Sequence, residues 1–282
     1  MKFIPDLEKL SIATARVKLF KRRIGFVPTM GALHAGHFSL INQARKENDI
    51  VVVSIFVNPA QFGPGEDFKK YPRPLKKDIE SCRRLGVDFL FLPDKNDMYP
   101  EGYSTFVNVD GLSDRLCGLK RPGHFRGVAT VVAKLLNIIS PDVLYLGQKD
   151  AQQAIIISRM VKDLNFPVKL KVMPTVRDKD GLALSSRNAY LSKNERAGAV
   201  ILFKALQLAE VLVRNGQRNS ARIISRMKQL IEKNKLAKID YIAIVDSERL
   251  KEIKRVKPVC LIALAVKIGK TRLIDNTIIG GV

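Results

Sequence analysis

Two of the three histidines in the chain, His34 and His37, lie close together in the stretch PTMGALHAGHFSL, residues 28–40. Two imidazoles three residues apart share one face of a helix or its first turn, and they can donate hydrogen bonds to phosphoryl oxygens. Gly31 and Gly36 allow close approach of the backbone to a ligand, and the N-terminus of a following helix favours an anion. The stretch therefore predicts a phosphate site, with polar helix caps and a metal pair as the alternatives.

Two further polar clusters contain groups that suit a nucleotide. GQKDAQQ, residues 147–153, follows a strand-like run, and we expect Lys149 to pair with a phosphate and Asp150 to hold a ribose hydroxyl. GLALSSRN offers two hydroxyls and a guanidinium in succession, which suits a polyanion on a mobile loop; these groups belong to Ser185, Ser186 and Arg187. Solvated charges are the alternative for the first cluster, and an ordinary polar turn for the second.

Two loops, NPAQFG (58–63) and RPGHFRG (121–127), carry amide and cationic groups. Such groups can recognise a hydroxy acid. The candidate residues are Asn58, Gln61, Arg121 and His124. Structural turns are the alternative for both loops.

The elements that must position these residues alternate in type through the first part of the chain. IVVVSIFVN, residues 50–58, is nearly continuous in apolar residues, as in a buried parallel strand. The alternation predicts a doubly wound (Rossmann-like) α/β domain with a parallel sheet over residues 1–176. Ligands collect beyond the carboxyl ends of such strands, and the strand expected at 24–28 ends at the histidine stretch. Other strands are expected at 87–93, 142–147 and 168–174, and helices at 38–48, 74–86, 127–139 and 151–165.

The pattern changes after about residue 177. Two helices are expected at 193–214 and 218–236, followed by three strand-like runs at 239–246, 259–268 and 270–279. A Gly-Lys turn joins the last two runs, which is typical of a hairpin. The pattern predicts a smaller α+β domain over residues 177–282, which we expect to close over the active site.

The 282 residues carry a formal net charge of +22. Such a surface can steer an anionic small substrate or recruit nucleic acid, and the spread of the basic residues along the chain favours steering. No apolar run reaches the ~20 residues that cross a bilayer, and MKFIPDLEKL does not resemble a signal peptide. We therefore expect a soluble, cytoplasmic protein without a membrane or nucleic-acid partner. The cysteines show no zinc or disulfide spacing; we expect Cys82 and Cys260 in the core and Cys117 in a loop.

Five collinear motifs closely resemble those of the pantothenate synthetase (pantoate–β-alanine ligase) family. PTMGALHAGH is similar to that family's form of the His-x-Gly-His signature of nucleotidylyltransferases and class I aminoacyl-tRNA synthetases. LSSRN is similar to the lysine- and serine-containing phosphate loop of those synthetases. The resemblance covers roughly residues 24–192, and the other matching stretches are FVNPAQFGPGEDFKKYPR, RPGHFRGVATVVAKL, GQKDAQQ and KDGLALSSRNAYLS.

The resemblance implies a two-step reaction. ATP and (R)-pantoate give pantoyl adenylate and pyrophosphate, and β-alanine then attacks the adenylate to give pantothenate and AMP. The resemblance also implies that Mg²⁺ accompanies ATP and that the protein is a cytoplasmic homodimer.

The resemblance also implies roles for particular residues. Catalysis is implied for His34, His37, Lys149 and Arg187, with His37 at the position that the family treats as proton donor. Pantoate binding is implied for Gln61 and Gln153, and Gln61 would also help to place β-alanine; Asn58, Arg121 and His124 complete the expected substrate contacts. ATP contacts are implied for Met30, Gly31, Ala32, Leu33, His34, Ala35, Gly36, His37, Gly147, Gln148, Lys149, Asp150, Val176, Leu184, Ser185, Ser186 and Arg187.

Two positions depart from the family pattern. Gln148 stands where glutamate is usual, and Ala151 where an aromatic residue is common. We expect Gln148 to alter loop packing or nucleotide affinity. Two other functions stay open: a different His-x-Gly-His nucleotidyltransferase with another acceptor, and a nucleic-acid-binding protein.

Overall fold

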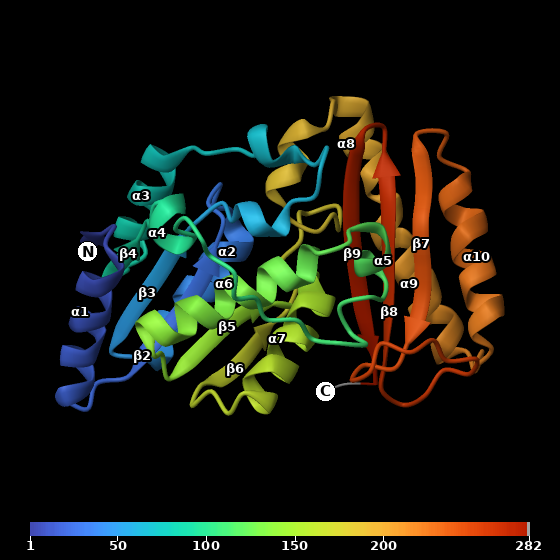
Figure 1. Cartoon of the computed structure of the whole chain (residues 1–282). Helices are drawn as coiled ribbons and strands as arrows, with labels where there is room; N and C mark the ends of the chain where they lie inside the picture. The colour runs from blue at the N-terminus through green and yellow to red at the C-terminus, as the bar shows by residue number, and fades with distance from the viewer. Residues whose placement is uncertain (281–282) are drawn as a thin grey trace. The chain divides into compact units, whose positions relative to one another are not determined.

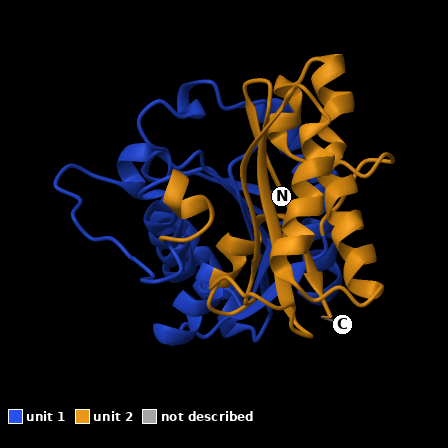
Figure 2. Cartoon of the chain, turned by 90° about the vertical axis from the view of Figure 1, so that its right-hand side faces the viewer, with its two compact units in different colours: residues 1–113, 121–147, 156–174 blue, residues 114–120, 148–155, 175–282 orange. Residues whose placement is uncertain are grey.

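The computed structural model describes residues 1–280 and divides the chain into two compact units (Figure 2). The first unit comprises residues 1–113, 121–147 and 156–174. The second comprises 114–120, 148–155 and the described residues from 175 onward. The sequence-based division into domains at residues 176 and 177 stays a prediction.

The first unit contains a six-stranded parallel sheet in the order β1-β4-β3-β2-β5-β6 (Figure 1). The strands are β1 (Lys2–Ile4), β2 (Ile24–Thr29), β3 (Ile50–Ile55), β4 (Phe89–Phe91), β5 (Val143–Gly147) and β6 (Lys169–Met173). The helices in this part of the chain are α1 (Leu7–Leu19), α2 (Ala35–Glu47), α3 (Leu75–Arg84), α4 (Lys95–Met98), α6 (His124–Ile139) and α7 (Ala151–Asp163), with 3-10 turns η1 (Pro59–Gln61) and η2 (Asp67–Lys69). The predicted α/β sheet is confirmed, and β1 and α1 precede the elements expected from the sequence.

Both faces of the central strands are buried, which explains their continuous apolar runs. Successive side chains of a strand point to opposite faces. On one face, residues of β2 and β3 pack with α2 and α3; this cluster includes Val27, Val51, Val53, Leu40, Ile41, Ala44 and Cys82. Phe26 of β2 is in register with Val52 of β3 and Leu144 of β5, at the alternate positions that point to the opposite face of the sheet. All three residues are fully buried. In Figure 1, α6 crosses in front of these strands.

The strand order reverses direction between β2 and β5. From β2 the chain continues through α2 to β3 on one side, and from β5 through α7 to β6 on the other side. Doubly wound sheets bind ligands beyond the carboxyl ends of strands at such a point. Thr29 and Gly147 are the last residues of these two strands, so the histidine stretch lies at the end of the sheet where a ligand is expected.

The second unit contains an antiparallel sheet of β7 (Ala237–Val245), β8 (Cys260–Ile268) and β9 (Thr271–Ile279). Its helices are α5 (Cys117–Lys120), α8 (Lys193–Ala199), α9 (Ile201–Arg214) and α10 (Ser220–Glu232), with 3-10 turns η3 (Gln148–Asp150) and η4 (Ser186–Tyr190). Apolar residues of α9 and α10 pack against the sheet; the cluster includes Leu202, Leu206, Ile223 and Met227 of the helices and Ile262 and Leu264 of β8. The predicted smaller α+β fold and the β8–β9 hairpin are confirmed.

Two local predictions are wrong. The helix expected at 193–214 is two helices, because the N–H of Val200 bonds to the Gly198 carbonyl and interrupts the regular pattern. Cys117 begins the short helix α5 and is buried, whereas a loop was expected. The predicted burial of Cys82 and Cys260 is confirmed.

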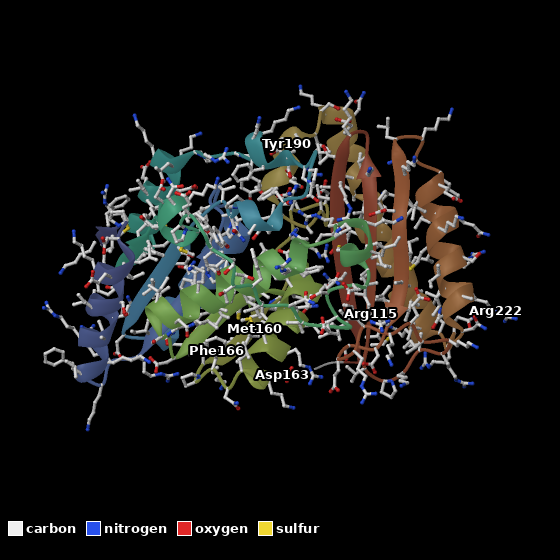
Figure 3. The ribbon with its side chains drawn as sticks, in the orientation of Figure 1. Arg115, Met160, Asp163, Phe166, Tyr190 and Arg222 are labelled. Atoms are coloured by element: carbon white, nitrogen blue, oxygen red, sulfur yellow. The ribbon has the colours of Figure 1, made fainter. Side chains whose placement is uncertain are left out.

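The basic side chains include exposed ones such as Arg222, which projects from α10 in Figure 3. Apolar side chains such as that of Met160 in α7 are buried instead; Met160 is 1% exposed. No helix within residues 1–280 has the length and apolar character needed to cross a membrane.

Candidate active site

The chain leaves β2 through a tight turn that ends at the first histidine. Gly31 has a φ of +82° and Ala32 a φ of +50°; a side chain in this left-handed region costs roughly 1–2 kcal/mol. The hydroxyl of Thr29 donates to the Ser54 carbonyl at 2.8 Å and accepts from the Gly31 N–H at 3.2 Å. The turn places His34 as the N-cap of α2.

His34 and His37 cap α2 together through one nitrogen of each ring. The Nδ1 of His34 accepts from the Gly36 N–H at 3.2 Å, and the Nδ1 of His37 accepts from the His34 N–H at 3.3 Å. A neutral imidazole that accepts at Nδ1 carries its proton on Nε2, so both rings are held as Nε2–H tautomers. The ring centroids lie 4.2 Å apart. The capping alternative is thus confirmed, and it is compatible with phosphate binding because each Nε2 is a hydrogen-bond donor.

Asp78 of α3 holds the same turn, although it was not singled out in the sequence. Its carboxylate accepts from the N–H groups of Ala32 and Leu33, each at 2.8 Å. The residue is 2% exposed, and this burial raises the pKa of Asp78 although both N–H groups favour the charged form. These two bonds support the left-handed conformation of Ala32.

A second group of the predicted residues surrounds η1. The Asn58 amide donates to the Gln61 side-chain oxygen and to the Gly127 carbonyl, each at 3.1 Å, while its oxygen accepts from the Tyr99 hydroxyl at 2.8 Å. Asn58 and Gln61 are 1% and 7% exposed. The Gln61 amide also lies 2.8 Å from the Met30 sulfur. The histidine turn and the NPAQFG loop therefore meet within the first unit.

Arg121 and His124 hold the backbone of Gln61. Arg121 makes two hydrogen bonds to Glu66, of 2.7 and 2.6 Å; burial opposes the charge, but the guanidinium lowers the pKa of Glu66. Arg121 also lies 2.9 Å from Nε2 of His124. Because a guanidinium only donates, Nε2 accepts, and the proton of the neutral ring is on Nδ1. That N–H donates to the Gln61 carbonyl at 2.7 Å.

Gly127 allows α6 to approach η1 closely. A Cβ at this position would lie 2.1 Å from the Ala60 carbonyl oxygen and 2.6 Å from the Gln61 nitrogen. Both atoms belong to the backbone, so only glycine fits here. This contact fixes the distance between the RPGHFRG and NPAQFG loops.

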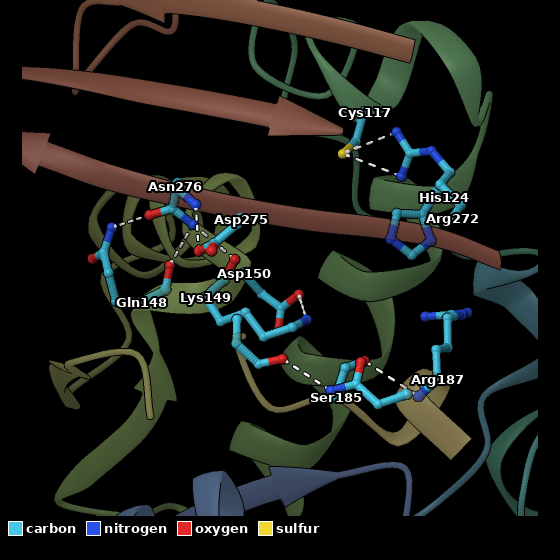
Figure 4. A network of polar contacts seen from close by, with 12 residues as sticks. Cys117, His124, Gln148, Lys149, Asp150, Ser185, Arg187, Arg272, Asp275 and Asn276 are labelled. Atoms are coloured by element: carbon cyan, nitrogen blue, oxygen red, sulfur yellow. Dashed lines mark hydrogen bonds and ion pairs between the residues drawn. The ribbon is translucent and has the colours of Figure 1, made fainter. Parts of the chain in front are cut away.

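In the second unit, Lys149 and Asp150 lie in η3, which leads into α7. Their charged groups are 3.4 Å apart, and the Lys149 side chain is 20% exposed. The amide of Asn276 in β9 donates to the carbonyls of Gln148 and Lys149 (Figure 4). Gln153, predicted to bind pantoate, lies in the first turn of α7 and is half-buried.

The serine–arginine segment follows a short antiparallel contact in the same unit. The Leu184 N–H donates to the Val176 carbonyl at 3.0 Å, so two predicted ATP residues are adjacent. Ser185 is the N-cap of η4, and its hydroxyl accepts from the Arg187 N–H at 3.3 Å. The segment therefore begins as a 3-10 turn held by its own backbone contacts, and its mobility stays a prediction.

The site predictions are brought together in two groups, one in each unit. The first unit joins the histidine turn to Asn58, Gln61, Arg121 and His124, and the second holds η3 and the serine–arginine segment. No group of three or more His, Cys, Asp or Glu residues among the described positions is arranged to hold a metal ion.

A family model described as pantoate-beta-alanine ligase matches residues 2–278. The chain belongs to this family of ATP-dependent ligases. It is 51% identical over 281 residues to the pantothenate synthetase of Thermosipho melanesiensis, with 100% of both chains covered. The resemblance found in the motifs therefore extends through the C-terminal third, where the sequence offers fewer motifs.

Solved structures of the family have the same fold. The pantothenate synthetase of Thermus thermophilus matches with a TM-score of 0.93 and 43% identity, over 98% of this chain and 99% of that one. The pantoate-beta-alanine ligase of Francisella tularensis, solved with beta-gamma ATP and beta-alanine, matches with a TM-score of 0.82 and 38% identity, over 98% and 97%.

Proposed function

We propose that the chain condenses (R)-pantoate with β-alanine at the expense of ATP, through a pantoyl-adenylate intermediate. The observation that carries this proposal is the family match over residues 2–278. The contact between Met30 of the histidine turn and Gln61 of the NPAQFG loop supports it, since the first carries the nucleotide motif and the second the proposed acid-binding motif.

In the first step, a pantoate carboxylate oxygen attacks the α-phosphorus of ATP. A new O–P bond forms, the bond to the bridging oxygen breaks, and pyrophosphate leaves with the electron pair. Donors that face the leaving group lower the barrier because negative charge grows there. We assign this role to the Nε2–H groups of His34 and His37, the second of which stands at the family's proton-donor position, and to the cations of Lys149 and Arg187.

In the second step, the amine of β-alanine attacks the acyl carbon of the adenylate. A C–N bond forms, AMP leaves, and the nitrogen loses a proton to give the amide. Much of the task here is orientation, which can contribute about 7–11 kcal/mol when reactants are well placed. We assign this positioning to Gln61, whose side chain and backbone are both held by neighbouring residues.

The remaining assignments follow the family motifs. We propose that Gln153, Asn58, Arg121 and His124 complete the pantoate side, with Arg121 and His124 acting through the Gln61 backbone. Asp150 would hold the ribose and Val176 would flank the adenine. The other proposed ATP contacts are Gly31, Ala32, Leu33, Ala35, Gly36, Gly147, Gln148, Leu184, Ser185 and Ser186.

The proposal includes Mg²⁺ as the companion of the ATP phosphates, and we assign it no protein ligand. The charge of +22 would steer the anionic substrates towards the protein. On the family resemblance, we also propose a homodimer in the cytoplasm.

The test is an assay with ATP, pantoate and β-alanine that follows AMP and pantothenate. His37→Ala and Lys149→Ala should each cut adenylate formation by about 10²–10³, in line with the loss of one oxyanion donor. Lys162→Ala, at an exposed position of α7, the helix that follows the turn of Lys149, should leave the rate unchanged. Near-normal turnover in both site variants would refute the assignment, and a folded protein that makes neither product would refute the function. Turnover with another acid but not with pantoate would favour a different nucleotidyltransferase.

A further inference from the structure

Strand β9 carries two adjacent buried polar residues, Asp275 and Asn276, that belong to none of the family motifs. They are 2% and 5% exposed. A polar side chain buried to this extent must be hydrogen-bonded to avoid a large free-energy cost. Figure 4 shows that the partners of Asn276 lie in η3, the turn assigned above to the nucleotide.

Asn276 holds the turn that contains Lys149. Its amide nitrogen donates to the Gln148 carbonyl at 3.0 Å and to the Lys149 carbonyl at 2.8 Å, and its oxygen accepts from the Gln148 side-chain amide at 2.8 Å. Because both carbonyls are acceptors, only the nitrogen of Asn276 can face them. This orientation turns its oxygen towards Gln148, so three hydrogen bonds fix η3 to β9.

Asp275 holds the segment that leads to Arg187. Its carboxylate accepts two hydrogen bonds from the Arg177 guanidinium, of 2.5 and 2.9 Å. Arg177 also donates to the Gly181 carbonyl at 3.1 Å and forms an antiparallel bridge with Ala183. The base of the segment that carries the serines and Arg187 is therefore tied to the strand position next to Asn276.

We propose that Asn276 and Asp275 are positioning residues that set the two nucleotide loops of the second unit from one strand. The proposal rests on the function proposed above. Neighbouring residues of β9 fix the peptide beside Lys149 and the base of the segment before Arg187, so a displacement of β9 changes both loops.

The bond between Gln148 and Asn276 also gives a role to Gln148, which stands where the family usually has glutamate. The Gln148 amide donates to the Asn276 oxygen, which a glutamate at 148 cannot do. A carboxylate at position 148 would face the Asn276 side-chain oxygen, and both groups are acceptors. Flipping the Asn276 amide would avoid this clash but would place its oxygen against the carbonyls of residues 148 and 149. Gln148 and Asn276 are thus paired through their two amides in this chain.

The test measures ATP binding to the full chain by calorimetry, with pantoate KM and thermal unfolding alongside. Asn276→Asp keeps the size of the side chain but removes both donors, and Gln148→Glu removes one. Thr277→Val is the matched control: it lies next along β9, and its hydroxyl donates to Glu210 of α9 at 2.6 Å, away from both loops. We expect Asn276→Asp to weaken ATP binding about tenfold or more, the equivalent of one or two lost hydrogen bonds. Gln148→Glu should weaken it about threefold to tenfold, on the same reasoning.

The pantoate KM separates positioning from general destabilisation. Loosened packing alone would change both substrates, whereas the proposal predicts that the pantoate KM stays within about twofold of the unchanged chain, a difference worth less than half a kcal/mol. If Asn276→Asp does not fold, Gln148→Glu alone decides the outcome. Variants that bind ATP as tightly as Thr277→Val would overturn this inference while leaving the enzyme proposal intact. Failure of the unchanged chain to bind ATP would overturn the enzyme proposal itself.

Discussion

Removing the carboxylate of Asp78 should loosen the turn that carries both histidines. Its two hydrogen bonds to the N–H groups of Ala32 and Leu33 are each 2.8 Å long. Hydrogen bonds to a charged group contribute about 1.5–3 kcal/mol each, or about 3–6 kcal/mol for the pair. The burial that raises the pKa of Asp78 offsets part of this gain. We therefore expect Asp78→Ala to lower the free energy of unfolding by about 2–4 kcal/mol, and Asp78→Asn, which keeps one acceptor, by about half as much.

The measurement is urea unfolding at neutral pH, followed by ATP titration of the folded variant. Glu80→Gln changes an exposed carboxylate of the same helix and serves as the control. Because Ala32 has a φ of +50°, the released turn should move towards ordinary backbone and displace His34, so ATP affinity should fall with stability. An Asp78→Ala variant that unfolds like the control and binds ATP normally would refute the reasoning.

Three other predictions concern single contacts of the first unit. The Lys171 ammonium and two further donors lower the pKa of Glu47 from 4.5 to about 2; the stability that Glu47 contributes is complete above pH 4.5 and is lost as the pH falls towards about 2. When the pH is lowered from 4.5 towards 2, the denaturation midpoint of Glu47→Gln should therefore fall less steeply than that of the unchanged chain. Equal slopes of midpoint against pH would contradict this. Gly127→Ala should destabilise the protein by about 2 kcal/mol or more and raise the pantoate KM, because its Cβ would meet the Ala60 carbonyl at 2.1 Å; an unchanged melting temperature would count against the close contact. Arg121→Lys loses the bidentate hydrogen bonds to Glu66. Steady-state kinetics should show a higher pantoate KM with an unchanged ATP KM, and the reverse pattern would disprove the assignment.

The features that could be predicted from the sequence are those set by local patterns. The β-branched run at 50–58 identified β3 because a strand buried on both faces has no polar side. The β8–β9 hairpin was predictable for a similar reason, since Gly269 and Lys270 separate two apolar runs. The histidine turn was recognisable because its small residues and two imidazoles are consecutive in the chain.

The residues that support the site could not be predicted, because their partners are distant in the sequence. Asn276 bonds to Gln148 across 128 positions, and no local signal links them. Asp78 follows two lysines in LKKDIESC, a pattern that is typical of a solvated charged surface. One hint was available: Asp78 and Cys82 lie four residues apart on the same face of α3, and both are buried.

The central claim is that ATP activates pantoate as an acyl adenylate, and oxygen labelling tests it most directly. Pantoate labelled with ¹⁸O in its carboxylate is incubated with ATP, β-alanine and the full chain, and the AMP is analysed by mass spectrometry. Attack of the carboxylate on the α-phosphorus predicts that one labelled oxygen passes into each AMP that forms with pantothenate. Unlabelled AMP formed in step with pantothenate would contradict the account.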